Sequence, residues 1–148
     1  MGMIADSMID GWLSSLPETD GIYRIIEKTR VDRDPEDRIS AIMVLGRSKD
    51  PRAVQPLIDC CRDKSPEIRF HAIEGLKNLR SGRSVEVLIE RLRNKGELYE
   101  IRKRAVIALA TIRSYGAIQE LKNRLVDSNE DGAIRSLIGW ELERVHIW

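Results

Sequence analysis

Apolar residues recur at steps of three and four along most of the chain, which is the spacing of one buried helical face. Over residues 66–79, such a stripe is formed by Ile68, Ala72, Ile73, Leu76 and Leu79. Residues 80–84 interrupt the stripe with Arg, Ser and Gly, and a second stripe starts at Val85. The pattern therefore predicts a helix, a tight turn and a second helix.

The same two-helix pattern returns with a period of 31 to 33 residues. A shift of 31 residues carries Pro35-Glu36-Asp37-Arg38 onto Pro66-Glu67-Ile68-Arg69. Two further shifts of 33 residues carry Ile68-Arg69 onto Ile101-Arg102 and then onto Ile134-Arg135. Because self-similarity at a fixed period is the signature of a repeat architecture, we expect the units to stack on one another.

The repeat predicts one all-α domain over residues 1–148, built of about nine helices. Its parts are an N-terminal helical pair or cap over 1–30, repeats over 35–64, 66–96 and 98–128, and a C-terminal capping helix over 129–148. At the two ends, the spacing predicts helices over 3–15, 19–30 and 130–145. Pro56 is tolerable in a second helix that starts near Val54, because it then occupies the first turn. Ser65 is placed to cap the helix that begins at Pro66.

The first repeat contains Ala41-x-x-x-Leu45-Gly46-Arg47, then Asp50-Pro51-Arg52-Ala53-Val54-x-Pro56-Leu57-Ile58. Together with Pro35-Glu36-x-Arg38, these residues resemble HEAT-like repeats of the phycobilisome-lyase (PBS lyase) type. The resemblance covers roughly residues 19–145, although Tyr99 stands where the earlier repeats have Pro. It implies a right-handed α-solenoid, an armadillo-like superhelix of about four helical hairpins that usually binds other macromolecules. It does not imply lyase activity.

Composition is typical of a globular protein rather than a disordered or membrane-spanning one. The 148 residues include 25 Lys and Arg, 24 Asp and Glu, and 42% hydrophobic residues, and this combination is too apolar for disorder. No apolar run approaches the roughly 20 residues that span a bilayer, and the first residues lack the positive region of a secretory signal. The adjacent Cys60 and Cys61 are not a disulfide framework. We therefore expect a cytoplasmic protein without a membrane partner.

Few residues are candidates for catalysis or metal binding. Deoxyhypusine hydroxylases share this repeat type and carry paired His-Glu ligands for iron, but the sequence has two histidines, His71 and His146, and no His-Glu dipeptide. Cys60 and Cys61 lack the further cysteines of a four-ligand zinc site. The sequence therefore predicts a protein that is not an enzyme, with no catalytic residue, cofactor or metal.

The same residues have simpler structural roles. His71 precedes the buried stripe of its helix, which predicts a partly exposed structural histidine rather than a ligand. Cys61 aligns with Leu92 and Leu125, which predicts a core position. Cys60 is then the more exposed thiol, and a reactive Cys60 is the alternative.

Arginines and tryptophans each follow a pattern that has a structural and a functional interpretation. Arg38, Arg69, Arg102 and Arg135 occupy one repeat position, and we expect them to pair with acids or helix-end carbonyls of an adjacent unit rather than with phosphates. The tryptophans lie in terminal elements, which favours end-capping over a binding hot spot. They are Trp12, Trp140 and Trp148.

The leading functional hypothesis is a non-enzymatic protein-protein interaction scaffold. It places the second helix of each repeat along a concave groove, with solvent-facing side chains one turn apart contacting a protein partner. The expected partner-binding residues are Gln55, Asp59, Arg62, Glu86, Glu90, Arg93, Gln119 and Asn123. We expect a monomer or a weak homo-oligomer.

Two other functions stay open. Residues 65–128 carry 13 basic against 8 acidic residues between acidic ends, which allows nucleic-acid binding through this basic middle. Against it stand a balanced total charge and few interleaved aromatic residues. The second alternative, an accessory subunit of a bilin-lyase-like modification enzyme, rests on the family resemblance alone.

Overall fold

The computed structural model describes residues 18–145, and every regular element among them is helical. The α-helices are α2 (Glu18–Glu27), α3 (Pro35–Arg47), α4 (Val54–Cys60), α5 (Pro66–Leu79), α6 (Val85–Arg93), α7 (Tyr99–Ile112), α8 (Tyr115–Val126) and α9 (Gly132–Arg144). Two short 3₁₀ turns, η1 (Pro51–Ala53) and η2 (Gly82–Ser84), precede α4 and α6.

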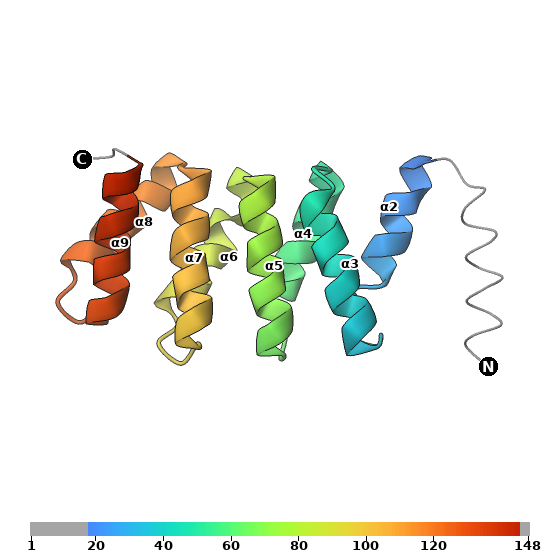
Figure 1. Cartoon of the computed structure of the whole chain (residues 1–148), viewed down its shortest axis with the longest axis horizontal. Helices are drawn as coiled ribbons and strands as arrows, with labels where there is room; N and C mark the ends of the chain where they lie inside the picture. Colours follow the sequence, from blue (N-terminus) through green and yellow to red (C-terminus); the bar gives the residue numbers. More distant parts are fainter. Residues whose placement is uncertain (1–17, 146–148) are drawn as a thin grey trace.

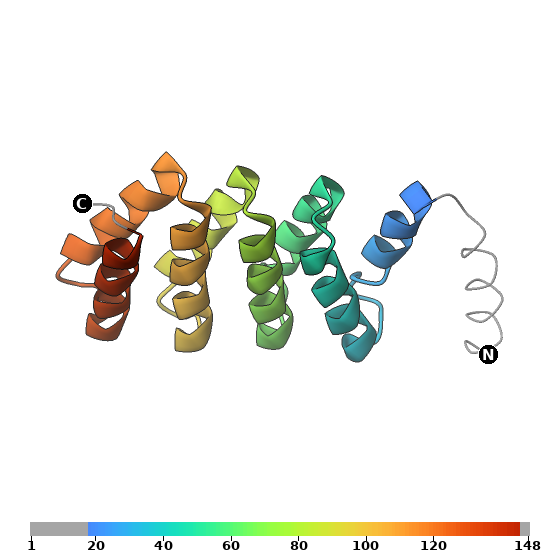
Figure 2. The same ribbon diagram turned by 45° about the horizontal axis from the view of Figure 1, so that its top comes forward.

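The helices form two layers of a solenoid. The first helices of the repeats, α3, α5, α7 and α9, stand side by side in one row (Figure 1). The second helices, α4, α6 and α8, lie behind that row, with each packed against the first helix that follows it (Figure 2). The prediction of an all-α solenoid is confirmed.

Helix starts follow the capping residues. Ser65 Oγ accepts a hydrogen bond from the Ile68 amide at 3.4 Å, and Pro66 takes the first position of α5, where no amide hydrogen bond is lost. The prediction for the first turn is also confirmed, because α4 begins at Val54 and Pro56 lies in its first turn.

Three of the first helices, α3, α5 and α7, end near a cation in the left-handed backbone region. Lys49, Arg80 and Arg113 have φ of 55°, 52° and 59°. The chain reverses at these residues to enter the second helix, so the three turns share one edge of the solenoid, at the top in Figure 1. We call the residues of these turns, 47–53, 78–84 and 112–116, the turn edge. The links 28–37, 61–67, 94–100 and 127–131 form the opposite edge, which we call the link edge.

The core lies between the two layers. Its largest fully buried side chains are Ile42, Leu45, Leu57, Ile68, Ile73, Leu76, Leu88, Leu92, Ile101, Leu109, Leu121 and Ile134. Burying each of them contributes about 1.5–3 kcal/mol relative to exposure. Residues from neighbouring repeats belong to one continuous cluster, so no repeat buries its apolar face alone.

The first two repeats meet at a pair of glycines. A β-carbon added to Gly46 of α3 would lie 2.6 Å from the Gly75 α-carbon of α5, closer than real atoms approach. The absence of side chains at both positions allows the two helix backbones to pack in direct contact.

The ends differ in part from the expectations. The helix predicted over 19–30 is α2, which ends at Glu27, and the helix predicted over 130–145 is α9. Trp140 of α9 is 59% exposed, so the prediction that it seals the end of the core is wrong. Trp12, Trp148 and the helix predicted over 3–15 lie outside the described residues. Among helices within 18–145, none has the length and apolar character to cross a membrane.

Replacing Gly46 by Ala should destabilise the protein. The added β-carbon collides with backbone rather than with a flexible side chain, and overpacking of this kind costs about 1–3 kcal/mol. Thermal unfolding followed by circular dichroism should show a midpoint lowered by several degrees. Gly21→Ala in α2, where nothing lies within 4 Å of the added atom, is the matched control and should leave the midpoint equal or higher. Equal midpoints for Gly46→Ala and wild type would contradict the close packing.

Candidate functional site

The exposed sides of α4, α6 and α8 form a surface that we call the second-helix surface. Gln55 and Asp59 lie exposed on α4, and the Gln55 amide donates to the Asp59 carboxylate at 3.0 Å. Arg62, just beyond α4, donates two hydrogen bonds to the Glu90 carboxylate of α6, at 2.8 and 3.0 Å. These bonds lower the pKa of Glu90.

A second bidentate pair joins α6 to α8. Arg93 donates to both carboxylate oxygens of Glu120, at 2.8 and 2.6 Å. The Glu120 side chain is 4% exposed, whereas that of Arg93 is 57% exposed. The exposed arginine therefore covers a buried acid, and its position is fixed by that bond.

A shallow depression of about 600 Å³ lies on α6 within the second-helix surface. Its lining residues are Gly82, Arg83, Val85, Glu86, Ile89, Glu90 and Arg93. Val85 and Ile89 supply partly buried apolar atoms, and Glu86 is exposed. Among the described residues, the Glu86 carboxylate makes neither a hydrogen bond nor an ion pair, so it is available to a partner.

The structure brings six of the eight expected partner-binding residues into one connected group across α4 and α6. Gln55 joins this group through Arg83, which donates to its side-chain oxygen at 3.2 Å. Gln119 and Asn123 lie on α8, half-buried and exposed, and neither lines the depression. Because Glu90 and Arg93 hold ion pairs, a substitution at either would change stability as well as binding.

Sequence reasoning missed Glu120 and Ile89 as parts of this surface. A spacing signal was present for the acid. Arg62 and Glu90 are 28 residues apart, and Arg93 and Glu120 are 27 apart, which is the repeat period less about one helical turn. Each arginine side chain therefore pairs with an acid of the next repeat that lies about one helical turn before the arginine's equivalent position.

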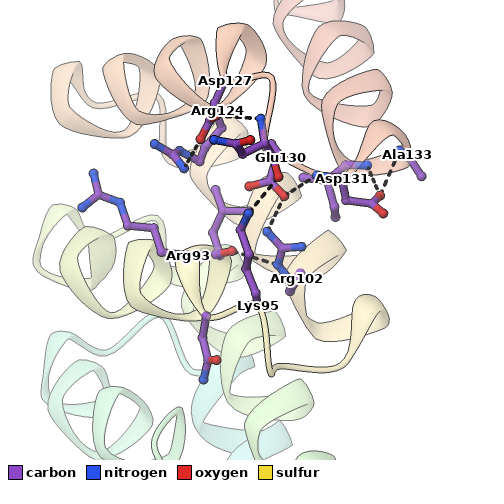
Figure 3. Close-up of polar contacts among 12 residues, drawn as sticks. Arg93, Lys95, Arg102, Arg124, Asp127, Glu130, Asp131 and Ala133 are labelled. Carbon is purple, nitrogen blue, oxygen red and sulfur yellow. Dashed lines mark hydrogen bonds and ion pairs between the residues drawn. The ribbon is translucent and has the colours of Figure 1, made fainter.

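A buried ladder of ion pairs follows the same spacing along the link edge. Arg69 pairs with Glu97 at 2.8 Å and Arg102 with Glu130 at 2.6 Å, each 28 residues on (Figure 3 for the second). Arg38 pairs with Asp63 at 2.6 Å. Arg135 donates to the Leu125 carbonyl at 3.0 Å. The prediction that these arginines bind acids or helix-end carbonyls is confirmed.

The ladder lowers the pKa of its acids. Burial opposes the ionisation of Glu97, but hydrogen bonds from Arg69, the Leu98 amide and Arg91 outweigh it and lower the pKa. At Asp63, burial is likewise outweighed by hydrogen bonds from Arg38 and from the Ser65 amide, and the pKa falls. Both carboxylates are therefore charged at neutral pH.

The cations of the middle repeats are largely used inside the protein. Arg102 and Arg69 belong to the ladder, and Arg93 holds Glu120. Further pairs within the described residues join Arg91 to Glu97, Lys103 to Glu100, Arg104 to Glu74, and Arg124 to both Glu120 and Asp127. These side chains have their charges balanced without an external anion.

The two cysteines and His71 lie in surroundings that suit structural rather than catalytic residues. Cys61 is fully buried, as predicted, and Cys60 is the more exposed of the two thiols, as predicted, although at 5% exposure it is buried too. Burial raises the pKa of Cys60 to about 11, which leaves little thiolate at neutral pH. His71 is half-buried, as predicted, with its ring against the edge of Phe70. Within 18–145, no group of His, Cys, Asp and Glu side chains is arranged to hold a metal ion.

Comparison with known proteins adds a family and a fold. A family profile described as HEAT repeats matches residues 24–99. No curated protein matches the chain. Among solved structures, human deoxyhypusine hydroxylase in complex with glycerol is similar, with a TM-score of 0.74 and 19% sequence identity. That match covers 84% of this chain but 43% of the hydroxylase chain, so this chain spans less than half of its length. At this identity the similarity shows the fold alone.

Acid should destabilise the protein through Glu97. Because folding lowers the pKa of Glu97 below the ordinary value of 4.5, the unfolded chain binds more protons at low pH. Stability should therefore fall as the pH drops below about 4.5, through the lower pKa of the folded state. Glu97→Gln should lower the free energy of unfolding at pH 7 by about 3 kcal/mol, because it leaves Arg69 and Arg91 without their carboxylate.

Urea unfolding of both proteins between pH 7 and pH 3 checks this. The difference between wild type and Glu97→Gln should shrink as the pH falls toward 3, because a wild-type carboxyl that binds a proton resembles the amide. A difference that stays constant over this range would show that Glu97 is not held by its charge.

Proposed function

This chain belongs to the HEAT repeat family, and we propose that it is a non-enzymatic scaffold that binds a protein partner through the second-helix surface. We expect this surface to be the concave one. The observation that carries the proposal is the depression on α6, where the carboxylate of Glu86 stands beside the apolar atoms of Ile89 and Val85. A charged group next to apolar surface is suited to a protein partner, which offers both kinds of contact.

The ion pairs around the depression support this proposal. Arg62 fixes Glu90 and Glu120 fixes Arg93, each through two hydrogen bonds. Side chains that are already ordered lose less conformational entropy when a partner binds. The surface therefore combines two side chains that are held in place, Glu90 and Arg93, with one acid that is available to a partner, Glu86.

Three features argue against the other functions. The middle cations are mostly paired with internal acids, which weakens the case for nucleic acid. Burial keeps both thiols from acting as nucleophiles, and the sequence has no His-Glu dipeptide. No contact or cavity of the described residues favours a bilin-lyase accessory role. A cytoplasmic monomer or weak homo-oligomer completes the proposal.

Glu86→Arg should weaken capture of the partner by about tenfold or more. The substitution reverses the charge at the centre of the depression without breaking an internal pair, so the fold should be retained. The immobilised wild-type and variant proteins are exposed to nuclease-treated lysate of the source organism, and the bound proteins are identified and quantified. Glu67→Arg makes the same charge change at an exposed position in the first turn of α5, and it should capture the same partner as wild type.

Equal capture of every bound protein by Glu86→Arg and wild type would overturn the proposal. So would a sample without nuclease treatment in which the main bound material is nucleic acid released by raising the salt concentration from about 0.15 M.

A further inference from the structure

The two edges of the solenoid differ strongly in charge. The turn edge carries six Lys and Arg and a single acid, Asp50, whereas the link edge carries six Lys and Arg and eleven Asp and Glu. Three of those acids are neutralised by Arg38, Arg69 and Arg102 of the adjoining helices. Asp50 is paired with Arg52 at 2.7 Å. The near-neutral total of the chain therefore conceals one strongly basic edge.

The other cations of the turn edge have no acid to balance them among the described residues. The side chains of Arg47, Lys49 and Arg80 are exposed and make neither hydrogen bonds nor ion pairs there. Arg83 and Arg113 donate to neutral oxygens, those of the Gln55 side chain and the Val145 carbonyl. This edge contrasts with the link edge, where buried arginines are matched to acids repeat by repeat.

Three of these cations occupy a backbone conformation that disfavours them. Lys49, Arg80 and Arg113 all have positive φ at equivalent positions, where glycine is the usual residue and any side chain costs free energy. The helix dipole favours a positive charge at this end of a helix. The result is a cation in every turn, held at the same place in each repeat.

The spacing of these cations fits an extended polypeptide. Packed helices lie about 8–10 Å apart, so neighbouring first helices present their end cations at about that interval. In a polyproline II segment, every third residue lies on the same face, and the rise of about 3.1 Å per residue separates such residues by about 9 Å. An acidic residue at every third position would therefore meet one cation per repeat.

We propose that the turn edge binds an extended acidic segment of a partner protein, with acidic side chains at every third residue opposite Lys49, Arg80 and Arg113. A nucleic acid fits less well, because each strand of B-DNA carries a charge about every 3.4 Å, so most of its phosphates would fall between these three cations. Stacking of bases also requires several exposed aromatic rings, whereas the described residues of this edge include a single one, Tyr115.

This inference goes beyond the proposed function, because it uses the turn edge, which shares only Gly82 and Arg83 with the lining of the depression. Glu86→Arg lies outside the turn edge, so it should leave binding of the acidic segment unchanged. Capture of the partner by Glu86→Arg and binding of the acidic segment therefore test the two proposals separately.

The test uses a fluorescent twelve-residue peptide, (Glu-Ser-Pro)₄, and fluorescence anisotropy with the full chain. The triple variant Lys49→Asn, Arg80→Asn, Arg113→Asn removes three cations, and Asn accepts the left-handed conformation, so the fold should be retained. We expect affinity to fall by roughly tenfold, the sum of three exposed ion pairs. Circular dichroism checks that the variant is folded.

A matched control removes three positive charges from the link edge. Lys28→Asn, Arg33→Asn, Lys64→Asn changes exposed residues whose side chains make no hydrogen bond or ion pair among the described residues, and it should bind the peptide like wild type. A peptide of the same composition with its four Glu residues consecutive should bind more weakly to wild type.

Three results would overturn the proposal. They are the absence of measurable peptide binding by wild type, equal losses of affinity in the two triple variants, and a dependence on the turn edge that is seen with a single-stranded oligonucleotide but not with the peptide.

Discussion

The burial of apolar faces between neighbouring repeats is the constraint on which this structure depends. A pair of helices leaves one side of its apolar stripe exposed, and in this chain the next repeat covers it, so the core is one continuous cluster. The contact of Gly46 with Gly75 brings the first two repeats together at the level of the backbone. Stability is thus a property of the stack rather than of any one unit.

Ion pairs then fix how each repeat is placed on the next. The ladder of Arg38, Arg69 and Arg102 crosses the junctions on the link edge, and Arg62 and Arg93 cross them on the second-helix surface. Buried pairs of this kind are costly to desolvate and strongly unfavourable to break. A slip of one repeat against its neighbour would separate several arginines from their acids at once, so the pairs oppose such movement.

The sequence was sufficient for the repeat, the two-helix unit and the start of α4, because these depend on local periodicity and on the fixed geometry of proline. It also indicated the role of Arg102 and its equivalents. The partner acids could not be predicted from equivalent repeat positions, because each pair joins residues that are about one turn out of register. The exposure of Trp140 and the burial of Cys60 were not predicted either.

Trp140 was expected to cap the end of the core, yet it lies at the same repeat position as Met43, which is also exposed. Cys60 is the more exposed of the two thiols, as expected, but at 5% exposure it is buried as well. It is covered because Thr29 of the link before α3 and Arg38 of α3 lie close to its thiol. Comparison of repeat positions does not reveal a contact of this kind, because it comes from a link between repeats.

The placement of ion pairs between repeats explains why some charges are available to a partner and others are not. The acids of the ladder and the Arg62–Glu90 and Arg93–Glu120 pairs hold repeats together, so they cannot be given to a partner without weakening the stack, whereas Glu86 of the second-helix surface stays available. On the turn edge the one acid, Asp50, pairs with Arg52, and the other cations have no acid partner because each turn is short and nearly free of acidic residues. A chain with a formal net charge of +1 has little general attraction to polyanions. Its basic edge can still attract an anionic segment at short range, where the local charge rather than the total determines the field.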